Sequence, residues 1–422
     1  MDFNDPNQEP EYEGKQHYAT GIKGFAAGIV AGILIFAVAG ALFPSVRTVI
    51  SDLPFAAKTD VSMDQQIQRK IDTIYEILDR YYVDDYDKAE TVESMYYGLV
   101  QGIGDPYTSY MNSAAFVKFR EDTEGQYAGI GVTVSVDTTD NTIVVVTLFE
   151  GYPGAQSGML PGDKIVSVNG HDVSGDTLDD AVSMMKGQPG TSVDVTIYRP
   201  SEKQMHEMTL TREKIDIPTV SHKMLDNGIA YIRITNFDRI TYDQFMKAYN
   251  DVKGEMTGLI LDLRGNPGGL LDVVVKITNV LVPEGIITYT EDKYGKREDH
   301  KSDANAIQVP LLLLVNGGSA SASEVLSGAV KDMGVGQLVG TRTFGKGLVQ
   351  NIFPMSDGSA IKATIAKYYT PNGVCIQGEG IEPDYPVEMS DKLSIRISSL
   401  SLEEDAQLSA AIDIMHKKLG IE

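Results

Sequence analysis

Cysteine, basic charge and metal-binding patterns are scarce in this chain of 422 residues. A single cysteine, Cys375, excludes an intrachain disulfide and a C-x-x-C zinc or redox site. The six histidines show no H-E-x-x-H or related spacing, so the sequence predicts no metal site and calls for no cofactor. The net charge of -23 argues against nucleic acid as a partner, because phosphate binding needs a basic surface.

One long hydrophobic run lies near the N-terminus. Phe25 to Phe43 spans 19 residues without a charge. As a helix it would rise about 28 Å, close to the thickness of a bilayer's hydrocarbon core. We therefore expect a single transmembrane helix at 25–43, with 1–24 as a cytoplasmic tail and 44–62 as a stalk. A buried soluble helix and a cleaved signal peptide are the alternatives, and five acidic residues before the run disfavour the signal peptide.

Neither the orientation nor the pairing of this helix is fixed by the residues around it. Two basic residues flank the run on each side, so their count favours no orientation. Gly24, Gly28 and Gly32 form a small-xxx-small row, which would allow a homodimer through paired helices.

Hydrophobic periodicity divides the remaining chain into four regions. Helical spacing predicts a small helical region at 63–126, and β-type runs predict a β-rich domain at 127–214. Strands and helices then alternate over 215–395, which is typical of a mixed α/β core. The end, 396–422, is predicted to form a C-terminal helix. The fold class is thus multidomain α/β.

The β-rich region 127–214 resembles a PDZ domain, most specifically in LPGDKIVSVNG. PDZ domains bind extended chain ends by β-addition, with backbone N–H groups holding the terminal carboxylate. On that resemblance, a tail would be captured by the loop of Ala128, Gly129, Ile130, Gly131 and Val132. A tight turn that binds nothing is the alternative. A cation such as Lys186 or Arg199 would then sense the docked tail.

A lysine lies on a glycine-rich turn in GTRTFGKGLVQ, residues 340–350. The segment begins like a phosphate-binding P-loop, G-x-x-x-x-G-K, but Gly347 stands where Ser or Thr would hold magnesium. Strands, rather than a helix, are predicted to follow. Lys346 therefore has no nucleotide-binding context, and a surface lysine is one reading of it.

A serine run gives Lys346 a second reading. In PLLLLVNGGSASASEVLSGAV, a strand ends at a turn and a helix begins, so a hydroxyl there would lie beside free N–H groups suited to an oxyanion. The competing reading is a capping box formed by Ser321 and Glu324. Because no histidine stands in an obvious position, a lysine kept neutral by burial is the base to consider. Strand alternation would place Gln350 on the same face as Lys346, where it could orient the amine.

The ordered segments DLRGNPGG, VNGGSASASE and TFGKGLVQ, placed after a PDZ-like region, resemble the carboxy-terminal processing peptidases, or tail-specific proteases. The resemblance covers roughly residues 65–390 and includes GIGDPYTSYM and GEGIEPDYPV. It implies a Ser-Lys protease core in which Ser321 is the nucleophile, Lys346 the general base and Gln350 its positioning residue. The implied oxyanion donors are Ala322 with Gly268 or Gly269, and Asp332 is implied to be structural.

The resemblance therefore implies a serine endopeptidase that acts on polypeptides with free C-termini. It also implies a cell-membrane protein with its catalytic part outside the cytoplasm. Two other functions remain open at this point. One is an inactive, membrane-tethered PDZ adaptor, against which the intact Ser321, Lys346 and Gln350 argue. The other is a non-peptidase acyl hydrolase, since α/β layers with glycine turns serve many chemistries.

Overall fold

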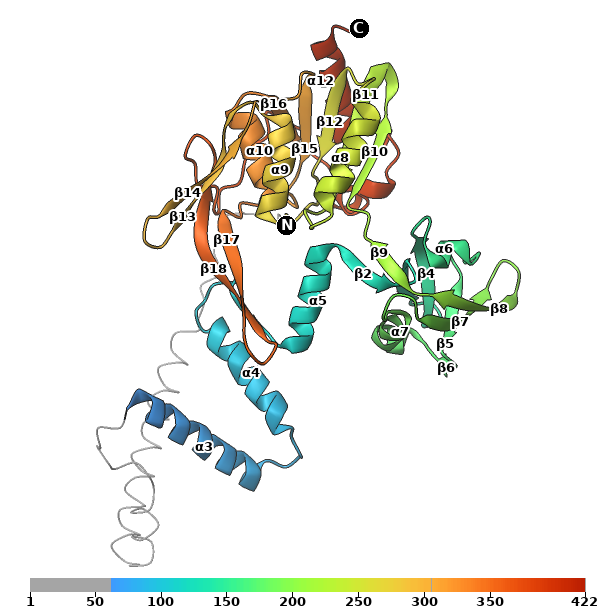
Figure 1. The fold of residues 1–422 in the computed structure, drawn as a ribbon, viewed down its shortest axis with the longest axis vertical. Helices are drawn as coiled ribbons and strands as arrows, with labels where there is room; N and C mark the ends of the chain where they lie inside the picture. The colour runs from blue at the N-terminus through green and yellow to red at the C-terminus, as the bar shows by residue number, and fades with distance from the viewer. Residues whose placement is uncertain (1–61, 305, 422) are drawn as a thin grey trace, which may run out of the picture. The chain divides into compact units, whose positions relative to one another are not determined.

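A computed structural model describes residues 62–304 and 306–421 (Figure 1). The predicted tail and transmembrane helix, and the stalk up to residue 61, lie outside these residues. Within the described part of the chain, no helix is both long and apolar enough to cross a bilayer. The chain divides into two units, one ending at Asp87 and the other beginning at Lys88.

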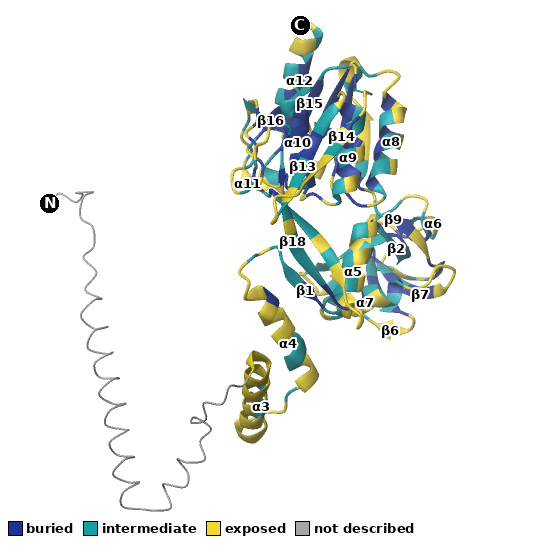
Figure 2. Ribbon diagram, turned by 60° about the vertical axis from the view of Figure 1, so that its left-hand side comes forward, coloured by how far each residue is buried: buried dark blue, intermediate teal, exposed yellow. Residues whose placement is uncertain are grey.

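The described part of the first unit is built around one helix, α3 (Met63–Tyr81). Ser62 caps its start by accepting a hydrogen bond from the N–H of Gln65 at 3.4 Å. None of its residues is buried, and its apolar side chains Ile67, Ile74 and Ile77 are about half exposed (Figure 2). The helical spacing read from the sequence is thus present, with its apolar stripe uncovered within this unit.

The second unit contains a central six-stranded sheet in the order β10-β11-β12-β15-β16-β19. The first pair is antiparallel and the others are parallel. Its strands are β10 (Val220–Met224), β11 (Ile229–Ile234), β12 (Gly258–Asp262), β15 (Leu311–Val315), β16 (Gly336–Gly340) and β19 (Tyr385–Pro386). Its helices are α8 (Thr241–Val252), α9 (Leu271–Leu281), α10 (Ala322–Asp332) and α12 (Ala406–Leu419), with a short α11 (Asp391–Ser394).

Helices cover both faces of this sheet. The side chains of α8, α9 and α10 pack with Leu259 and Leu313, whereas those of α12 pack with Ile260 and Leu312 from the opposite face. Every residue of β12 and β15 is therefore buried (Figure 2). This explains their unbroken apolar sequences, since a parallel strand covered on both faces needs no polar alternation.

A second sheet includes a strand from the region 63–126, which was predicted to be helical. It contains β1 (Ser109–Met111), β18 (Ala360–Tyr369), β13 (Gly285–Asp292), β14 (Arg297–Ser302) and β17 (Leu348–Pro354), all paired antiparallel. Region 63–126 supplies α4 (Lys88–Gln101) and α5 (Ser113–Glu124), but also β1 between them. Ser109 lies opposite Lys362 on β18. The segment at 104–111 is thereby held against the core.

The β-rich domain has a separate hydrophobic core, formed by Ile143, Ile165, Val195 and their neighbours. Its sheet has the order β3-β4-β5-β7-β8, with β6 paired to β5. The elements are β3 (Val132–Asp137), β4 (Thr142–Leu148), α6 (Pro153–Gln156), β5 (Lys164–Val168), β6 (His171–Asp172), α7 (Leu178–Met185), β7 (Ser192–Arg199) and β8 (Gln204–Thr211). A separate ribbon pairs β2 (Gln126–Gly129) with β9 (Glu213–Asp216). Strands and one main helix thus occur in the order expected from the sequence.

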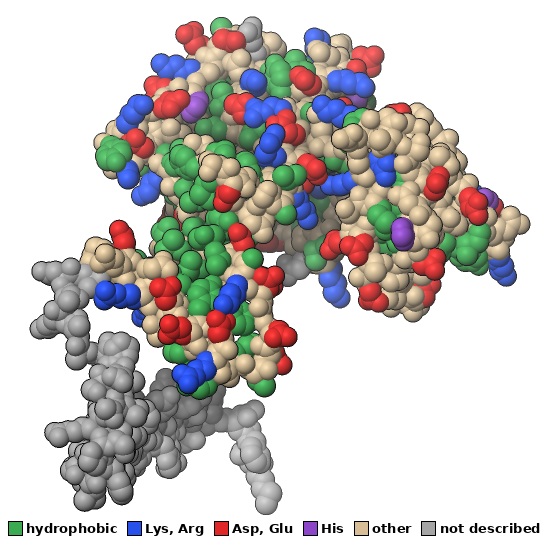
Figure 3. All heavy atoms as spheres, turned by 60° about the horizontal axis from the view of Figure 1, so that its bottom comes forward, with side chains coloured by type: hydrophobic (Ala, Val, Ile, Leu, Met, Phe, Trp, Pro, Cys, Tyr) green, Lys and Arg blue, Asp and Glu red, His purple; other side chains and the backbone are tan. Residues whose placement is uncertain are grey.

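The surface carries charges of both signs. On the face shown in Figure 3, Lys and Arg side chains are scattered among acidic ones, with apolar patches between them. No single basic region dominates that face.

Candidate active site

Two loops meet at the carboxyl ends of the neighbouring parallel strands β12 and β15. The carbonyl of Asn266, in the loop after β12, accepts from the Ala320 N–H at 3.0 Å and from the Ser323 hydroxyl at 3.0 Å. The loop after β15 is thereby tied to the loop after β12. In open α/β sheets, this edge is where binding sites form.

Ser321 stands at the junction of the β15 loop and α10, in a strained backbone conformation. Its φ of 53° and ψ of -112° are unfavourable for a residue with a side chain. Such strain is typical of nucleophiles presented on a strand-to-helix turn. Glu324 Oε2 accepts from the Ser321 N–H at 2.8 Å, so Glu324 takes the part expected of it in the capping box. Gly268 lies close by: a Cβ there would approach Ser321 Cβ to 2.8 Å, so no side chain fits.

Lys346 lies in an irregular loop just before β17 and is partly buried. Burial lowers the pKa of its amine below the usual value, and the positive charge of Lys362 lowers it further. The carboxylates of Asp105 and Glu324 act in the opposite direction. Its Nζ lies 4.7 Å from the centroid of the Tyr107 ring, which belongs to the segment held by β1. The environment therefore favours a neutral amine more than bulk water does.

A cavity of about 540 Å³ brings most of the predicted site residues together. Its lining includes Ser321, Ala322, Lys346, Gln350 and Gly269. Among the hydrogen bonds of the described residues, none joins the Ser321 hydroxyl to the Lys346 amine. The two side chains share a cavity in this state without a direct bond between them.

Gln350 lines the cavity, but not for the reason predicted from strand alternation. Lys346 precedes β17, and the pairing of β17 with β18 shifts between Val349 and Gln350. The extra residue of this bulge, Ile365, lies on β18, so the alternation within β17 is intact but does not extend to Lys346, which lies in irregular backbone before the strand. The Gln350 amide donates to the Thr364 hydroxyl at 3.4 Å, and no hydrogen bond among the described residues links it to Lys346.

The predicted oxyanion donors differ in availability. The Gly268 N–H already donates to Asn266 Oδ1 at 2.9 Å. Within the described part of the chain, the N–H groups of Ala322 and Gly269 have no acceptor, and both residues line the cavity. In this state, Gly269 is therefore the glycine of the pair with an N–H free to bind an oxyanion.

Glu324 has a larger part in the site than its predicted role as a cap. Its carboxylate is fully buried and accepts from the Thr343 hydroxyl at 2.6 Å, from the Gly345 N–H at 2.7 Å and from the Lys346 N–H at 2.8 Å. Together with the bond from Ser321, it links the serine turn to the lysine loop. The capping box pointed to Glu324 in the sequence, but nothing local pointed to these distant partners.

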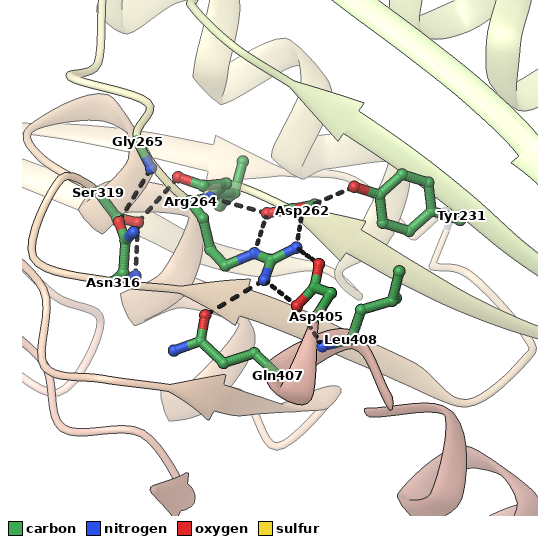
Figure 4. Close-up of polar contacts among 10 residues, drawn as sticks. Tyr231, Asp262, Arg264, Gly265, Asn316, Ser319, Asp405, Gln407 and Leu408 are labelled. Atoms are coloured by element: carbon green, nitrogen blue, oxygen red, sulfur yellow. Dashed lines mark hydrogen bonds and ion pairs between the residues drawn. The ribbon is translucent and has the colours of Figure 1, made fainter. Parts of the chain in front are cut away.

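A buried ion network anchors the loop after β12, as Figure 4 shows. The Arg264 guanidinium is fully buried and donates to both oxygens of Asp262 and both oxygens of Asp405, at 2.7–3.0 Å. Tyr231 donates to Asp262, and Gln407 accepts from Arg264. Burial opposes ionisation of Asp405, but the bonds from Arg264 hold its pKa below the usual value. The loop is thus fixed to the start of α12.

A second cavity, of about 370 Å³, lies in the β-rich domain. Its lining includes Gly129, Ile130 and Val132 of the loop predicted to capture tails, with side chains of β3, α7 and Phe149. The other two loop residues are not part of its lining. The Ala128 carbonyl accepts from the Gly187 N–H at 3.2 Å, and the Gly131 carbonyl accepts from the Phe149 N–H at 2.9 Å.

The two cations considered as tail sensors lie in different surroundings. Lys186 lines this groove, pairs with Glu121 at 2.8 Å and lies 5.4 Å from the centroid of the Tyr127 ring. Arg199 is buried and forms a two-bond pair with Asp163, both bonds at 2.8 Å. Arg199 is therefore committed to the interior of the domain and does not line the groove.

Asp332 lies at the end of α10, away from Ser321 at its start. Its Oδ2 accepts from the Asn372 N–H at 2.9 Å and so fixes the turn after β18. Within the described residues, no cluster of His, Cys, Asp and Glu side chains is placed to hold a metal ion.

Three segments of the chain match known families. Residues 228–387 match peptidase family S41, 144–199 match the PDZ domain, and 44–115 match the N-terminal domain of the activating protease CtpB.

Proteins with similar sequences span most of the chain. The carboxy-terminal processing protease CtpB of Bacillus subtilis is 34% identical over 380 residues, which cover 87% of this chain and 78% of that protein. A carboxy-terminal-processing protease of Bartonella bacilliformis is 34% identical over 363 residues, covering 84% and 82%. Among solved structures, a photosystem II D1 C-terminal processing protease is 31% identical, with a TM-score of 0.44 and coverage of 75% and 86%.

Proposed function

The chain belongs to peptidase family S41 and is a serine-type carboxy-terminal processing protease, and we propose that Ser321 and Lys346 are its catalytic dyad. The observation that carries this assignment is their shared cavity. There the strained serine begins α10 beside the free N–H of Ala322, and the lysine is partly buried. A lysine can serve as a base in place of histidine when its environment favours the neutral amine.

In the proposed reaction, the neutral Lys346 amine removes the Ser321 proton as Oγ attacks the scissile carbonyl carbon. The oxyanion accepts hydrogen bonds from the Ala322 N–H and from a glycine N–H of the 266–269 loop. The carbon–nitrogen bond breaks, and Lys346 returns the proton to the leaving amine. Water then attacks the acyl-enzyme ester, again losing its proton to Lys346, and Ser321 is regenerated. Gln350 would orient the amine when substrate fills the cavity.

The PDZ domain, on this proposal, binds the C-terminal tail of the substrate. Its strand β3 is an end strand of its sheet, so one edge is available for β-addition by an extended tail. The groove beside β3 is lined by Val132, Val134, Val182 and Met185 among others, which suits apolar tail residues. Lys186, at the end of α7, is in the lining of this groove and would lie beside a docked tail.

Residues 25–43 are proposed to anchor the protein in the cell membrane by a single helix, with the catalytic part outside the cytoplasm. The support is the length of this run and its lack of charge. A homodimer through Gly24, Gly28 and Gly32 stays a prediction.

The test compares the full-length chain in detergent as wild type, Ser321→Ala and Lys346→Ala, with the exposed Lys367→Ala as a matched control. The substrate is an unstructured protein with an apolar C-terminus, either free or amidated. We expect wild type and the Lys367 variant to cleave, faster with the free tail, and the other two to be inactive. Cleavage by folded Ser321→Ala would overturn the dyad. Equal cleavage rates for the free and the amidated substrate would show that the enzyme does not select its substrates by a free C-terminus.

A further inference from the structure

A buried tyrosine joins the two residues of the dyad through their backbones. Tyr368, on β18, is 3% exposed and lines the catalytic cavity. Its hydroxyl donates to the Ser321 carbonyl at 3.0 Å and lies within hydrogen-bond reach of the Lys346 carbonyl. No motif in the sequence singled out Tyr368, and the reaction above gives it no task.

Glu324 contacts the same two residues from their other backbone groups. Its Oε2 accepts from the N–H of Ser321 and from the N–H of Lys346. Each residue of the dyad is therefore held at its N–H by the carboxylate, and the two carbonyls share the single proton of the phenol. We call this pair, Glu324 and Tyr368, the backbone clamp.

Both segments of the dyad need such restraint. Ser321 has a φ of 53°, a conformation that costs on the order of 1–3 kcal/mol and persists only when its surroundings enforce it. Lys346 lies outside any strand or helix, between two glycines that allow the loop many conformations. Without cross-links, neither segment would hold its side chain at one separation from the other.

We propose that Tyr368 is a positioning residue that, with Glu324, fixes the separation of Ser321 and Lys346 through their backbones. The inference rests on the proposed dyad, because it concerns how those two residues are held. A displacement of about 1 Å between reacting groups can lower a rate about 100-fold. The hydrogen bonds of Tyr368 go to the backbone carbonyls of Ser321 and Lys346 and not to their reacting side-chain atoms, so we expect its loss to lower the rate of the chemical step.

The surroundings of Tyr368 disfavour ionisation of its phenol. Burial raises the pKa of Tyr368 well above its usual value, and the nearby charge of Glu324 adds to this. The phenol therefore keeps its proton, and its role as a hydrogen-bond donor, to higher pH than an exposed tyrosine does.

The neighbouring tyrosine supplies a matched control. Tyr369 follows Tyr368 on the same strand, so its side chain points to the opposite face. It stacks on Tyr289 at a centroid distance of 4.9 Å and does not line the catalytic cavity.

The experiment measures kcat and KM of the full-length chain for one peptide substrate, in wild type, Tyr368→Phe and Tyr369→Phe. We expect Tyr368→Phe to lower kcat about 10- to 100-fold and to leave KM within about threefold. Its pH profile should rise at higher pH than that of the wild type, because a loosened lysine loop admits water and raises the pKa of Lys346. Tyr369→Phe should match wild type in kcat, in KM and in its pH profile.

Stability is measured alongside by thermal melting. A loss of activity in Tyr368→Phe that only follows its unfolded fraction would overturn the clamp, as would wild-type kcat and an unshifted pH profile. Replacing Tyr368 by 4-aminophenylalanine, which keeps a donor at the same position, should restore most of kcat, and failure to do so in a folded protein would also overturn it. Activity in folded Ser321→Ala or Lys346→Ala would instead show that Ser321 and Lys346 are not the catalytic dyad.

Discussion

The backbone N–H groups of Ser321 and Lys346 donate to the same atom, Oε2 of Glu324, each at 2.8 Å. The other carboxylate oxygen accepts from Thr343 and Gly345. A fully buried carboxylate is tolerated because its hydrogen bonds replace those it would make with water, and because it lies in the first turn of α10, where the helix dipole favours negative charge.

Replacing Glu324 by Gln should therefore abolish activity and destabilise the fold. Each oxygen of the Glu324 carboxylate accepts hydrogen bonds from buried donors. In glutamine one of these oxygens becomes an NH₂ group, which is itself a donor, so the buried N–H groups that it faces lose their acceptor. We expect a loss of about 3 kcal/mol in the free energy of unfolding, measured by urea denaturation, with activity reduced at least about 100-fold. The control is Glu382→Gln, an exposed carboxylate paired with Arg342, which should stay within about 0.5 kcal/mol. Retained activity in Glu324→Gln would contradict this role.

The pH dependence of catalysis should respond to two neighbours of Lys346 in opposite directions. Lys346 must be neutral to act as a base, so kcat/KM should rise with pH through its lowered pKa. The charge of Lys362 contributes to that lowering, and the charge of Asp105 opposes it. Lys362→Gln should therefore move the ascending limb to higher pH, and Asp105→Asn should move it to lower pH.

Both variants are compared with wild type on one peptide over the whole profile. Shifts of the same sign in the two, or none in either, would show that the limb does not report Lys346. Asparagine at 105 keeps the oxygen that accepts from the Tyr107 N–H at 3.0 Å, but it replaces the oxygen that accepts from the Thr108 hydroxyl at 2.6 Å, so a melting curve accompanies this variant.

The buried network around Arg264 should matter far more to stability than an exposed ion pair of the same chemistry. Asp405→Asn leaves the guanidinium, which is fully buried, with one carboxylate in place of two. We expect a loss of about 1–3 kcal/mol in the free energy of unfolding, because Asp262 still neutralises Arg264 but the amide NH₂ of asparagine leaves a buried guanidinium N–H without its acceptor. The matched change Asp272→Asn breaks the half-exposed pair with Arg239 and should cost less than about 1 kcal/mol. Equal losses in urea denaturation would be inconsistent with this ranking.

The elements that position the site could be predicted from the sequence, because each one is encoded by a pattern within a short run of consecutive residues. The apolar runs GLILD and LLLLV predicted β12 and β15, and the glycine and serine segments after them predicted the turns that carry Gly268 and Ser321. Long-range pairing was not predictable in this way. Arg264 and Asp405 are 141 positions apart, and nothing in either segment alone indicates that they meet.

Two further differences have specific physical causes. Strand β1 is only three residues long, too short to show an alternating pattern, and it exists because β18 offers a partner. Tyr368 follows ordinary strand alternation, so its sequence context did not distinguish it from Tyr369. Its role depends on two carbonyls brought to it from other segments.

Asp238 should make the protein less stable as pH rises from about 4 to about 6. This side chain, 6% exposed, lines the catalytic cavity; burial and the like charge of Asp122 raise its pKa from 3.8 to about 6. Because the folded state then binds this proton more tightly than the unfolded state, the contribution of Asp238 to stability is highest below pH 4. It falls between the two pKa values and is constant above them. The rise in the pKa of Asp238 from 3.8 to about 6 corresponds to a loss of at most about 3 kcal/mol in the free energy of unfolding.

Asp238→Asn should therefore be more stable than wild type at pH 7, and the two should converge near pH 4. Asp122→Asn should lower the pKa of Asp238 and so narrow the pH interval over which stability is lost. Urea denaturation of the three proteins at several pH values provides the measurement. A wild type as stable as Asp238→Asn at pH 7, or a stability gap that does not change with pH, would mean that Asp238 keeps an ordinary pKa despite its burial.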